Sequence, residues 1–184
     1  SRQEELKKIL ENEKKKNQIY DCIVPVSGGK DGSYVSYKLK NDYNIRPLTI
    51  TVRPPLESEI GSKNLKSFIN SGYDHIHFSP NQKTMKYLNK FGFIEKGFPY
   101  YGWLIAIHTV ILRFAVNFNI SLIFYGEDGE VEYGGSDLTK NNPFYDVDYE
   151  RKIYLEDGYE KVLSKINAND NDLYFFKFPK EIET

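Results

Sequence analysis

The chain has 184 residues, of which 40% are hydrophobic and 28% charged, as is typical of one globular domain with a buried core. The formal net charge of -1 argues against a nucleic-acid substrate, and the single cysteine, Cys22, excludes an internal disulfide and favours a reducing cytoplasm. The longest apolar run, 103–112, is shorter than the ~20 residues of a membrane span, and no signal peptide is recognisable, so we expect a cytoplasmic protein without a membrane partner.

Helical and strand patterns alternate along the first 125 residues. We expect helices over 4–16, 31–40, 59–69, 84–94 and 103–118, and strands over 20–26, 47–52, 74–78 and 121–125. This order predicts an α/β fold with a doubly wound parallel sheet, right-handed crossovers and strand order 3-2-1-4, with a possible extra strand. The strands are apolar runs, which fits a sheet covered on both faces.

The remaining sequence carries weaker signals. We expect a short helix over 159–166 and either a strand or an apolar strip over 173–178. As domains we expect an N-terminal helix, 1–18, followed by one nucleotide-binding domain, 19–184. His75 and His77 alternate along the third expected strand, where a metal pair is conceivable but two partly exposed histidines are the preferred interpretation.

A glycine-rich turn, 27–33, joins the first expected strand to the helix that follows it and reads SGGKDGS. Gly28 and Gly29 let the backbone approach an anion closely, because they lack a Cβ atom. The N–H groups of the first helical turn, with the helix dipole behind them, would then bind a phosphate. The alternative is an ordinary turn between a strand and a helix.

The polar side chains of this turn suit a nucleotide. Ser27 and Ser33 can add hydroxyl donors and Lys30 a positive charge, whereas Asp31 fits an N-terminal helix position or a magnesium ligand. The spacing is neither that of the Walker A loop nor that of the dinucleotide-binding loop. It resembles the PP-loop of the ATP pyrophosphatases, which usually have serine where this chain has Gly32.

Two further strand ends would meet this turn if the strand order is 3-2-1-4. Thr51, Val52 and Arg53 end the second strand, and the segment 126–135, which reads GEDGEVEYGG, follows the fourth. Its four carboxylates could bind Mg²⁺ beside a polyphosphate, orient a nucleophile or bind sugar hydroxyls. An acidic surface turn is the alternative.

Three segments together resemble the N-acetyl sugar amidotransferase family, a PP-loop branch: VSGGKDGSY, TVRPPLESEIGSKNLKSFINSGYDHIHFSP and LIFYGEDGEVEYGG. The resemblance runs from about Tyr20 to Gly135. It implies an enzyme that uses ATP and Mg²⁺ to adenylate the N-acetyl group of a nucleotide-linked sugar. Ammonia would then displace AMP to give an acetamidino sugar for lipopolysaccharide O-antigen, other bacterial surface polysaccharides or flagellar glycans.

The resemblance also implies partners, namely a glutaminase and an ammonia-channelling subunit. Family members usually carry an N-terminal cysteine pair and a substantial C-terminal half that this sequence does not show, so we expect a fragment of a longer protein.

Within this mechanism the candidate residues take distinct roles. We expect catalytic and magnesium-binding functions for Asp31 and Glu127, with Lys30 as a further catalytic group. We expect ATP to contact Ser27, Gly28, Gly29, Gly32, Ser33, Thr51, Val52 and Gly126, with the backbone of Thr51 and Val52 reading adenine. We expect the sugar substrate to contact Arg53, Glu132, Tyr133 and Gly134, although a surface salt bridge for Arg53 and a core position for Tyr133 are equally open.

Two other functions compete with this one. A tRNA-thiolating PP-loop enzyme would need a basic face and a catalytic cysteine, whereas Cys22 lies within a strand and the net charge is slightly negative. A non-catalytic ATP-binding module is compatible with the departure at Gly32.

Overall fold

The computed structural model describes residues 1–127, 146–153, 155, 159–166 and 168–182. The chain divides into two compact units, and three separate stretches of sequence contribute to each. The first unit comprises Ser1–Thr51, Glu57–Phe78 and the described residues from Asn117 to Glu127. The second comprises Val52–Leu56, Ser79–Val116 and the described residues from Asp146 onward.

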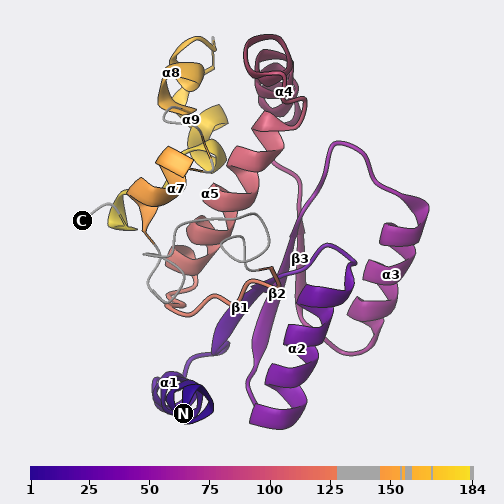
Figure 1. The fold of residues 1–184 in the computed structure, drawn as a ribbon, viewed down its shortest axis with the longest axis vertical. Coiled ribbons are helices and arrows are strands. Elements are labelled where there is room, and N and C mark those ends of the chain that lie inside the picture. Colours follow the sequence, from indigo (N-terminus) through magenta and orange to yellow (C-terminus); the bar gives the residue numbers. More distant parts are fainter. Residues whose placement is uncertain (128–145, 154, 156–158, 167, 183–184) are drawn as a thin grey trace. The chain divides into compact units, whose positions relative to one another are not determined.

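The first unit is built on a three-stranded parallel sheet with β2 in the middle, which confirms the α/β class (Figure 1). The strands are β1 (Cys22–Pro25), β2 (Pro47–Val52) and β3 (His75–Phe78). Cys22 is opposite Pro47, and this register continues to Pro25 opposite Ile50. Every residue of β2 is buried, as expected for a central strand covered on both faces.

Three helices belong to this unit: α1 (Arg2–Lys15), α2 (Lys30–Tyr43) and α3 (Glu59–Asn70). Figure 1 shows α2 and α3 on the same face of the sheet, as two successive right-handed crossovers require. Apolar side chains of these helices, of β1 and of the residues just after β1 and α2 form one buried cluster, which comprises Leu10, Cys22, Val24, Val26, Leu39, Ile45 and Leu65.

The segment expected as a fourth strand, 121–125, pairs with β1 through a single parallel bridge between Ile23 and Ile123. The Ile23 N–H donates to the Leu122 carbonyl, and the Phe124 N–H donates to the Ile23 carbonyl, both at 2.9 Å. The segment is therefore not a full strand of the described sheet. It begins just after a left-handed turn at Asn119, whose φ is 55°.

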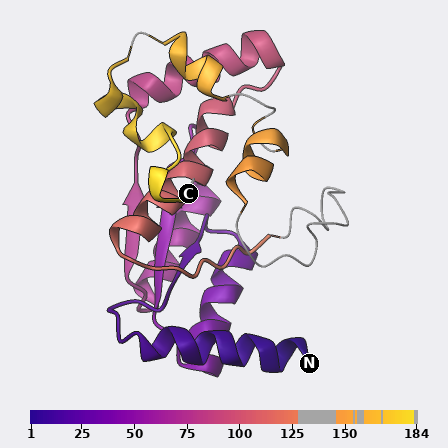
Figure 2. The ribbon, with the colours of Figure 1, turned by 90° about the vertical axis from the view of Figure 1, so that its left-hand side faces the viewer.

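The second unit is helical. It contains α4 (Gln82–Lys96), α5 (Tyr101–Asn117), α7 (Val147–Ile153), α8 (Tyr159–Ser164) and α9 (Asp170–Leu173), followed by the short 3-10 helices η1 (Tyr174–Phe176) and η2 (Lys180–Ile182). In Figures 1 and 2 the orange and yellow C-terminal helices gather beside α4 and α5. None of the described helices is long and apolar enough to cross a membrane.

The helix α5 is buried on most of its faces, and it holds the C-terminal segment by hydrogen bonds. Thr109 Oγ1 donates to the Phe175 carbonyl at 2.7 Å, and Arg113 donates to the Lys177 and Phe178 carbonyls at 3.1 and 3.0 Å. These bonds occupy carbonyl groups that, in a strand, would accept hydrogen bonds from a neighbouring strand. The expectation of a strand over 173–178 is therefore wrong, whereas the apolar strip is confirmed by buried Phe176 and Phe178.

Candidate functional site: the glycine loop

The segment 27–33, here called the glycine loop, turns from the end of β1 into the first turn of α2. Gly28 has a φ of 83°, a conformation that side chains rarely adopt. A Cβ atom there would lie 2.4 Å from the Gly61 carbonyl oxygen and 3.2 Å from the Leu65 nitrogen. Glycine is therefore required at position 28 both by its dihedral angle and by the close approach of α3.

Gly32 lies in the first turn of α2 and packs against the end of β1. A Cβ atom at this position would lie 2.6 Å from the Pro25 carbonyl oxygen and 3.2 Å from Val26 Cγ1. The serine that PP-loop sequences usually carry here would overlap this carbonyl. Close packing between helix and strand thus explains why this chain has glycine at position 32.

Gly126 brings the end of the segment 121–125 to the same place. Its Cβ position would be 2.5 Å from the Gly32 nitrogen and 2.8 Å from the Asp31 carbonyl carbon. The backbone at 126, followed by the exposed Glu127, therefore lies against the N-terminal turn of α2. The structure brings together two of the strand ends that the sequence analysis placed on one rim.

The N-terminus of α2 has the geometry of an anion site. Its N-cap residue is Gly29, with φ of -80° and ψ of 174°, and a glycine has no side chain to cap the first N–H groups of this 14-residue helix. The dipole of the helix adds a partial positive charge at this end. By contrast, α3 begins nearby with a side-chain cap, in which Ser58 Oγ accepts from the Gly61 N–H at 3.0 Å.

The polar side chains of the glycine loop are already in contact with one another. Lys30 Nζ lies 2.7 Å from Asp31 Oδ1, with the two side chains 88% and 42% exposed. Ser33 Oγ donates to the Gly29 carbonyl at 2.7 Å, which leaves its oxygen as an acceptor. Ser27 is exposed beside them. The loop therefore offers one exposed cation, one carboxylate and two hydroxyl groups around the helix end.

The side chain of Thr51 stabilises the position of the loop. Its buried Oγ1 donates to the Val26 carbonyl at 2.5 Å, which joins the end of β2 to the residue before the loop. In the second unit, the carbonyl of buried Val52 accepts a bond from Trp103 Nε1 at 3.2 Å. Arg53, which follows it, is exposed. Sequence reasoning missed the positioning role of Thr51 and the contact with Gly61; a small residue in the first turn of α3 was the available signal.

The expected acidic segment falls largely outside the described residues, which include Gly126 and Glu127 but not Glu132, Tyr133 or Gly134. Among the residues that the structure describes, no three His, Cys, Asp or Glu side chains gather as a metal site. Asp31 and Glu127 are carboxylates on the two segments that meet at the N-terminal turn of α2, and carboxylate oxygens are the ligand type that Mg²⁺ uses beside phosphate.

Cys22, His75 and His77 lie outside the glycine loop and make structural contacts. Cys22 is fully buried, and burial raises the pKa of its thiol to about 12. His75 is half-buried, and its Nδ1 lies 3.0 Å from Thr49 Oγ1. Burial, and secondarily the charge of His77, lowers the pKa of His75 to about 4. The interpretation of two partly exposed histidines is confirmed, since the His77 side chain is 42% exposed beside Glu57.

No protein-family model matches this chain, and no curated protein is significantly similar to it.

Proposed function

We propose that the chain binds ATP at the glycine loop and transfers its AMP moiety to the N-acetyl group of a nucleotide-linked sugar, as the sequence resemblance implies. The observation that carries this proposal is the turn at Gly28, which leads from a parallel strand into the side-chain-free N-cap of α2. Backbone N–H groups at such a helix end bind phosphate oxygens without any further cation.

The reaction consists of two displacements. The amide carbonyl oxygen attacks the α-phosphorus of ATP, the bond from that phosphorus to the β-bridging oxygen breaks, and pyrophosphate leaves. Ammonia then adds to the carbonyl carbon, the carbon–oxygen bond breaks, and AMP leaves with the former amide oxygen. An acetamido group thereby becomes an acetamidino group, and a glutaminase with an ammonia-channelling subunit would supply the ammonia.

The loop residues serve this chemistry through charge. Negative charge accumulates on the leaving pyrophosphate, and fixed donors at the α2 N-terminus stabilise it in the transition state. Asp31 and Glu127 would hold the Mg²⁺ that accompanies ATP, and Asp31 would then give up its ion pair with Lys30. An exposed ion pair contributes only about 0–1 kcal/mol, so this exchange costs little and frees Lys30 to approach a phosphate.

The finer architecture belongs to the same proposal. The bridge between Ile23 and Ile123 lies on the edge of β1 away from β2, which supports strand order 3-2-1-4 in a doubly wound sheet. A cytoplasmic location is part of the proposal too, because ATP and nucleotide sugars are cytoplasmic substrates.

The buried thiol of Cys22, the chain's single cysteine, argues against a thiolating enzyme that needs an accessible thiolate.

The test is ATP–pyrophosphate exchange with a UDP-linked diacetamido sugar as acceptor, comparing wild type with Asp31→Asn. We expect sugar-dependent exchange in wild type and a loss of at least about tenfold in the variant, as removal of a group that holds the metal predicts. Asp42→Asn is the matched control, because it removes the same charge from an exposed position at the far end of α2, where it pairs with Lys38.

Each outcome of this test decides something. If Asp31→Asn kept the wild-type rate of pyrophosphate exchange, Asp31 would have no role in the mechanism. If Asp31→Asn and Asp42→Asn lost activity equally, the loss would be due to the change in net charge. With ammonium present, mass spectrometry should show one oxygen of the sugar replaced by NH. An unchanged sugar would overturn the amidotransferase assignment.

A non-catalytic ATP-binding module is the second candidate. The observation that favours it is the direct ion pair between Lys30 and Asp31, in which the carboxylate is engaged by a cation of its own loop. This candidate predicts that wild type binds ATP but exchanges no pyrophosphate with any acceptor.

A further inference from the structure

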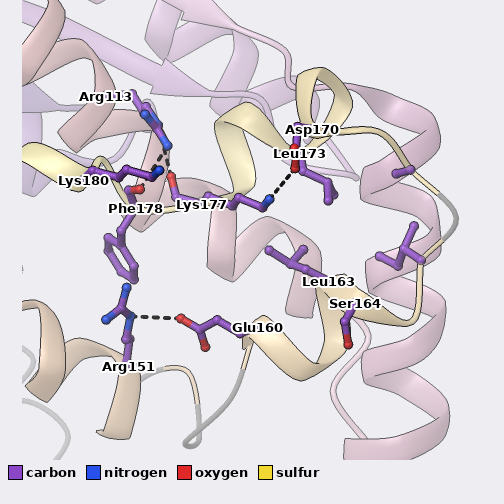
Figure 3. Close-up of a pocket in the computed structure, with 12 residues that line it drawn as sticks. Arg113, Arg151, Glu160, Leu163, Ser164, Asp170, Leu173, Lys177, Phe178 and Lys180 are labelled. Atoms are coloured by element: carbon purple, nitrogen blue, oxygen red, sulfur yellow. Dashed lines mark hydrogen bonds and ion pairs between the residues drawn. The ribbon is translucent and has the colours of Figure 1, made fainter. Parts of the chain in front are cut away.

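Positive side chains gather in two places in the described part of the second unit, and the first is a cavity of about 610 Å³ (Figure 3). Arg151 lies there with its Nε 3.1 Å from Glu160 and its Nη1 3.5 Å from Asp148. Lys177 Nζ lies 2.8 Å from Asp170, in a separate pair. These two cations of the cavity are therefore already engaged by carboxylates.

The second place is an exposed face of α4, where the lysines have no such partners. The outer face of α4, as we call it, consists of lysines and large apolar residues at helical spacing: Lys83, Lys86, Tyr87, Lys90, Phe93 and Ile94. All six residues are exposed, and Phe93 and Ile94 are each 64% exposed. No side chain of the described residues forms an ion pair with the three lysines. Glu95 is the one carboxylate of α4, and helical spacing places it outside this face.

The opposite face of α4 is packed against the second unit. Leu88 is fully buried, and a Cβ atom at Gly102 of α5 would lie 2.6 Å from its Cβ. Asn89 Oδ1 accepts a bond from the Gly102 N–H at 2.8 Å. Asn81 caps the start of the helix, and Gly97, in the left-handed conformation, ends it. The outer face is thus presented by a helix whose inner face and both ends are fixed (Figure 1).

The composition of the outer face is complementary to an anionic lipid surface. Lysine is depleted in protein–protein interfaces, whereas helices that lie on membranes combine lysine with phenylalanine and other apolar residues. The lysine stems let the charges reach lipid phosphate groups while the apolar side chains enter the region between the headgroups. Phe98 and Tyr100, which follow the helix, are each 38% exposed and add to the apolar side chains available there.

A nucleic acid is a poorer match for this face. Proteins that bind single strands stack the bases on aromatic rings along a charged groove. The outer face of α4 is the surface of one helix, and Ile94, among its most exposed apolar residues, has no ring on which a base could stack.

We propose that the outer face of α4 binds the surface of an anionic membrane, with its lysines on lipid phosphate groups and its apolar side chains between the headgroups. Binding of this kind needs no helix that spans the membrane. It departs from the expectation that the chain has no membrane partner, which rested on the lengths of the apolar runs. The proposal does not depend on the function proposed for the glycine loop.

The experiment is flotation of the complete 184-residue chain with lipid vesicles on a density gradient. Vesicles of phosphatidylcholine alone are compared with vesicles of phosphatidylcholine and phosphatidylglycerol in equal parts. We expect the chain to float with the anionic vesicles and to stay behind with the neutral ones. Raising the salt concentration to about 0.5 M should weaken binding, because salt screens the charges of the lysines.

A double variant tests the lysines. Lys86→Gln with Lys90→Gln should lower the affinity for anionic vesicles about 25-fold, since each lysine near such a surface contributes roughly fivefold. Lys7→Gln with Lys8→Gln is the matched control, because it removes the same charge from exposed positions of α1 in the first unit. We expect this control to bind nearly as wild type does.

A single variant tests the apolar side chains. Ile94→Ser should lower the affinity roughly tenfold, because an isoleucine would no longer leave water on binding. Isoleucine and serine have similar helix propensities, so α4 should be retained, and circular dichroism checks this. Ile19→Ser is the matched control, since Ile19 is 76% exposed in the first unit, and it should bind as wild type does.

Failure to float with anionic vesicles, or equal flotation with neutral ones, would overturn the proposal. Equal weakening by the α4 variants and their controls would overturn the assignment to α4. The same proteins are titrated with oligothymidylate and with polyglutamate. If either polymer bound through Lys86 and Lys90 while vesicles did not bind, the partner would be a nucleic acid or an acidic protein instead. None of these outcomes bears on pyrophosphate exchange, so the two proposals fail separately.

Discussion

At the residue scale, Gly28, Gly32 and Gly126 each lie where a Cβ atom would overlap the backbone of another segment. Their contacts join the loop to α3, to the end of β1 and to the backbone that follows Ile123. Backbone atoms cannot move aside as flexible side chains do, so these three positions set the shape of the loop. Gly29 differs from them, because its Cβ position meets only Ser27 Oγ, at 3.3 Å.

This contrast predicts opposite effects at neighbouring glycines. Gly32→Ala should lower the free energy of unfolding by about 1–3 kcal/mol, because the new methyl group overlaps the Pro25 carbonyl. Gly29→Ser should leave it unchanged or raise it by a few tenths of a kcal/mol, since serine is a good N-cap residue. Urea unfolding of both variants checks this, and wild-type stability of Gly32→Ala would contradict the packing described here.

His75 makes stability depend on pH. Its folded pKa of about 4 lies below the ordinary 6.5, so between these values the unfolded chain binds more protons. The contribution is complete above pH 6.5 and is lost as the pH falls through 4. The ring is only half-buried, so we expect a loss of roughly 1–2 kcal/mol rather than the full linkage value.

The free energy of unfolding is measured for wild type and for His75→Gln between pH 7 and pH 4. The difference between the two proteins isolates the contribution of His75, because the carboxylates contribute equally to both. His77→Gln should keep most of the acid loss, because burial is the larger cause of the shift at His75. Parallel curves for wild type and His75→Gln would show that His75 titrates normally.

At the scale of elements, α5 determines the conformation of the chain that ends the second unit. The buried Thr109 hydroxyl lies 2.7 Å from the Phe175 carbonyl and 2.9 Å from the Ile105 carbonyl of its own helix, so the two carbonyls share its single proton. Arg113, one turn later, takes the next two carbonyls of that segment. These contacts place Lys177 and Phe178 on the wall of the cavity.

Thr109→Val keeps the shape of this side chain and removes its hydroxyl. We expect a loss of about 1–3 kcal/mol, because the Phe175 carbonyl is left without this donor. Amide hydrogen exchange over 174–178 should become faster in this variant. Thr109→Ser, which retains the hydroxyl, should keep the exchange slow, and faster exchange in both variants would assign the effect to the lost methyl group instead.

At the scale of the whole molecule, no compact unit is a continuous stretch of sequence, since the chain passes between the two units repeatedly. Neither unit can therefore be isolated as one continuous segment, and function is better tested on the whole 184-residue chain. Ligand binding to the folded state raises the free energy of unfolding by an amount set by the ratio of the free ligand concentration to its Kd.

The proposed function predicts that MgATP at 100 times its Kd stabilises the chain by about 2.7 kcal/mol. Gly29→Ser should lose this stabilisation while folding normally, because the serine hydroxyl caps the N–H groups that phosphate would take. Urea unfolding with and without MgATP measures both values. Equal stabilisation of Gly29→Ser and wild type would place ATP elsewhere.

Local sequence patterns alone determined much of the first unit. The bounds of β2 agree with the expected 47–52, and Cys22 lies within a strand as expected, because periodicity and apolarity act over a few neighbouring residues. The glycine loop was recognisable for the same reason, since strand, turn and helix start are consecutive in the chain.

Only the tertiary structure decided the features that join distant residues. The segment 173–178 is not a strand because bonds from α5, more than 60 residues earlier, take its carbonyls. Gly32 is required by a strand carbonyl, and His75 loses its basicity through burial rather than through its sequence neighbours alone. The cationic cavity draws its lining from several separate elements. Each of these features depends on packing between residues that are distant in the sequence, and a local sequence pattern does not predict such packing.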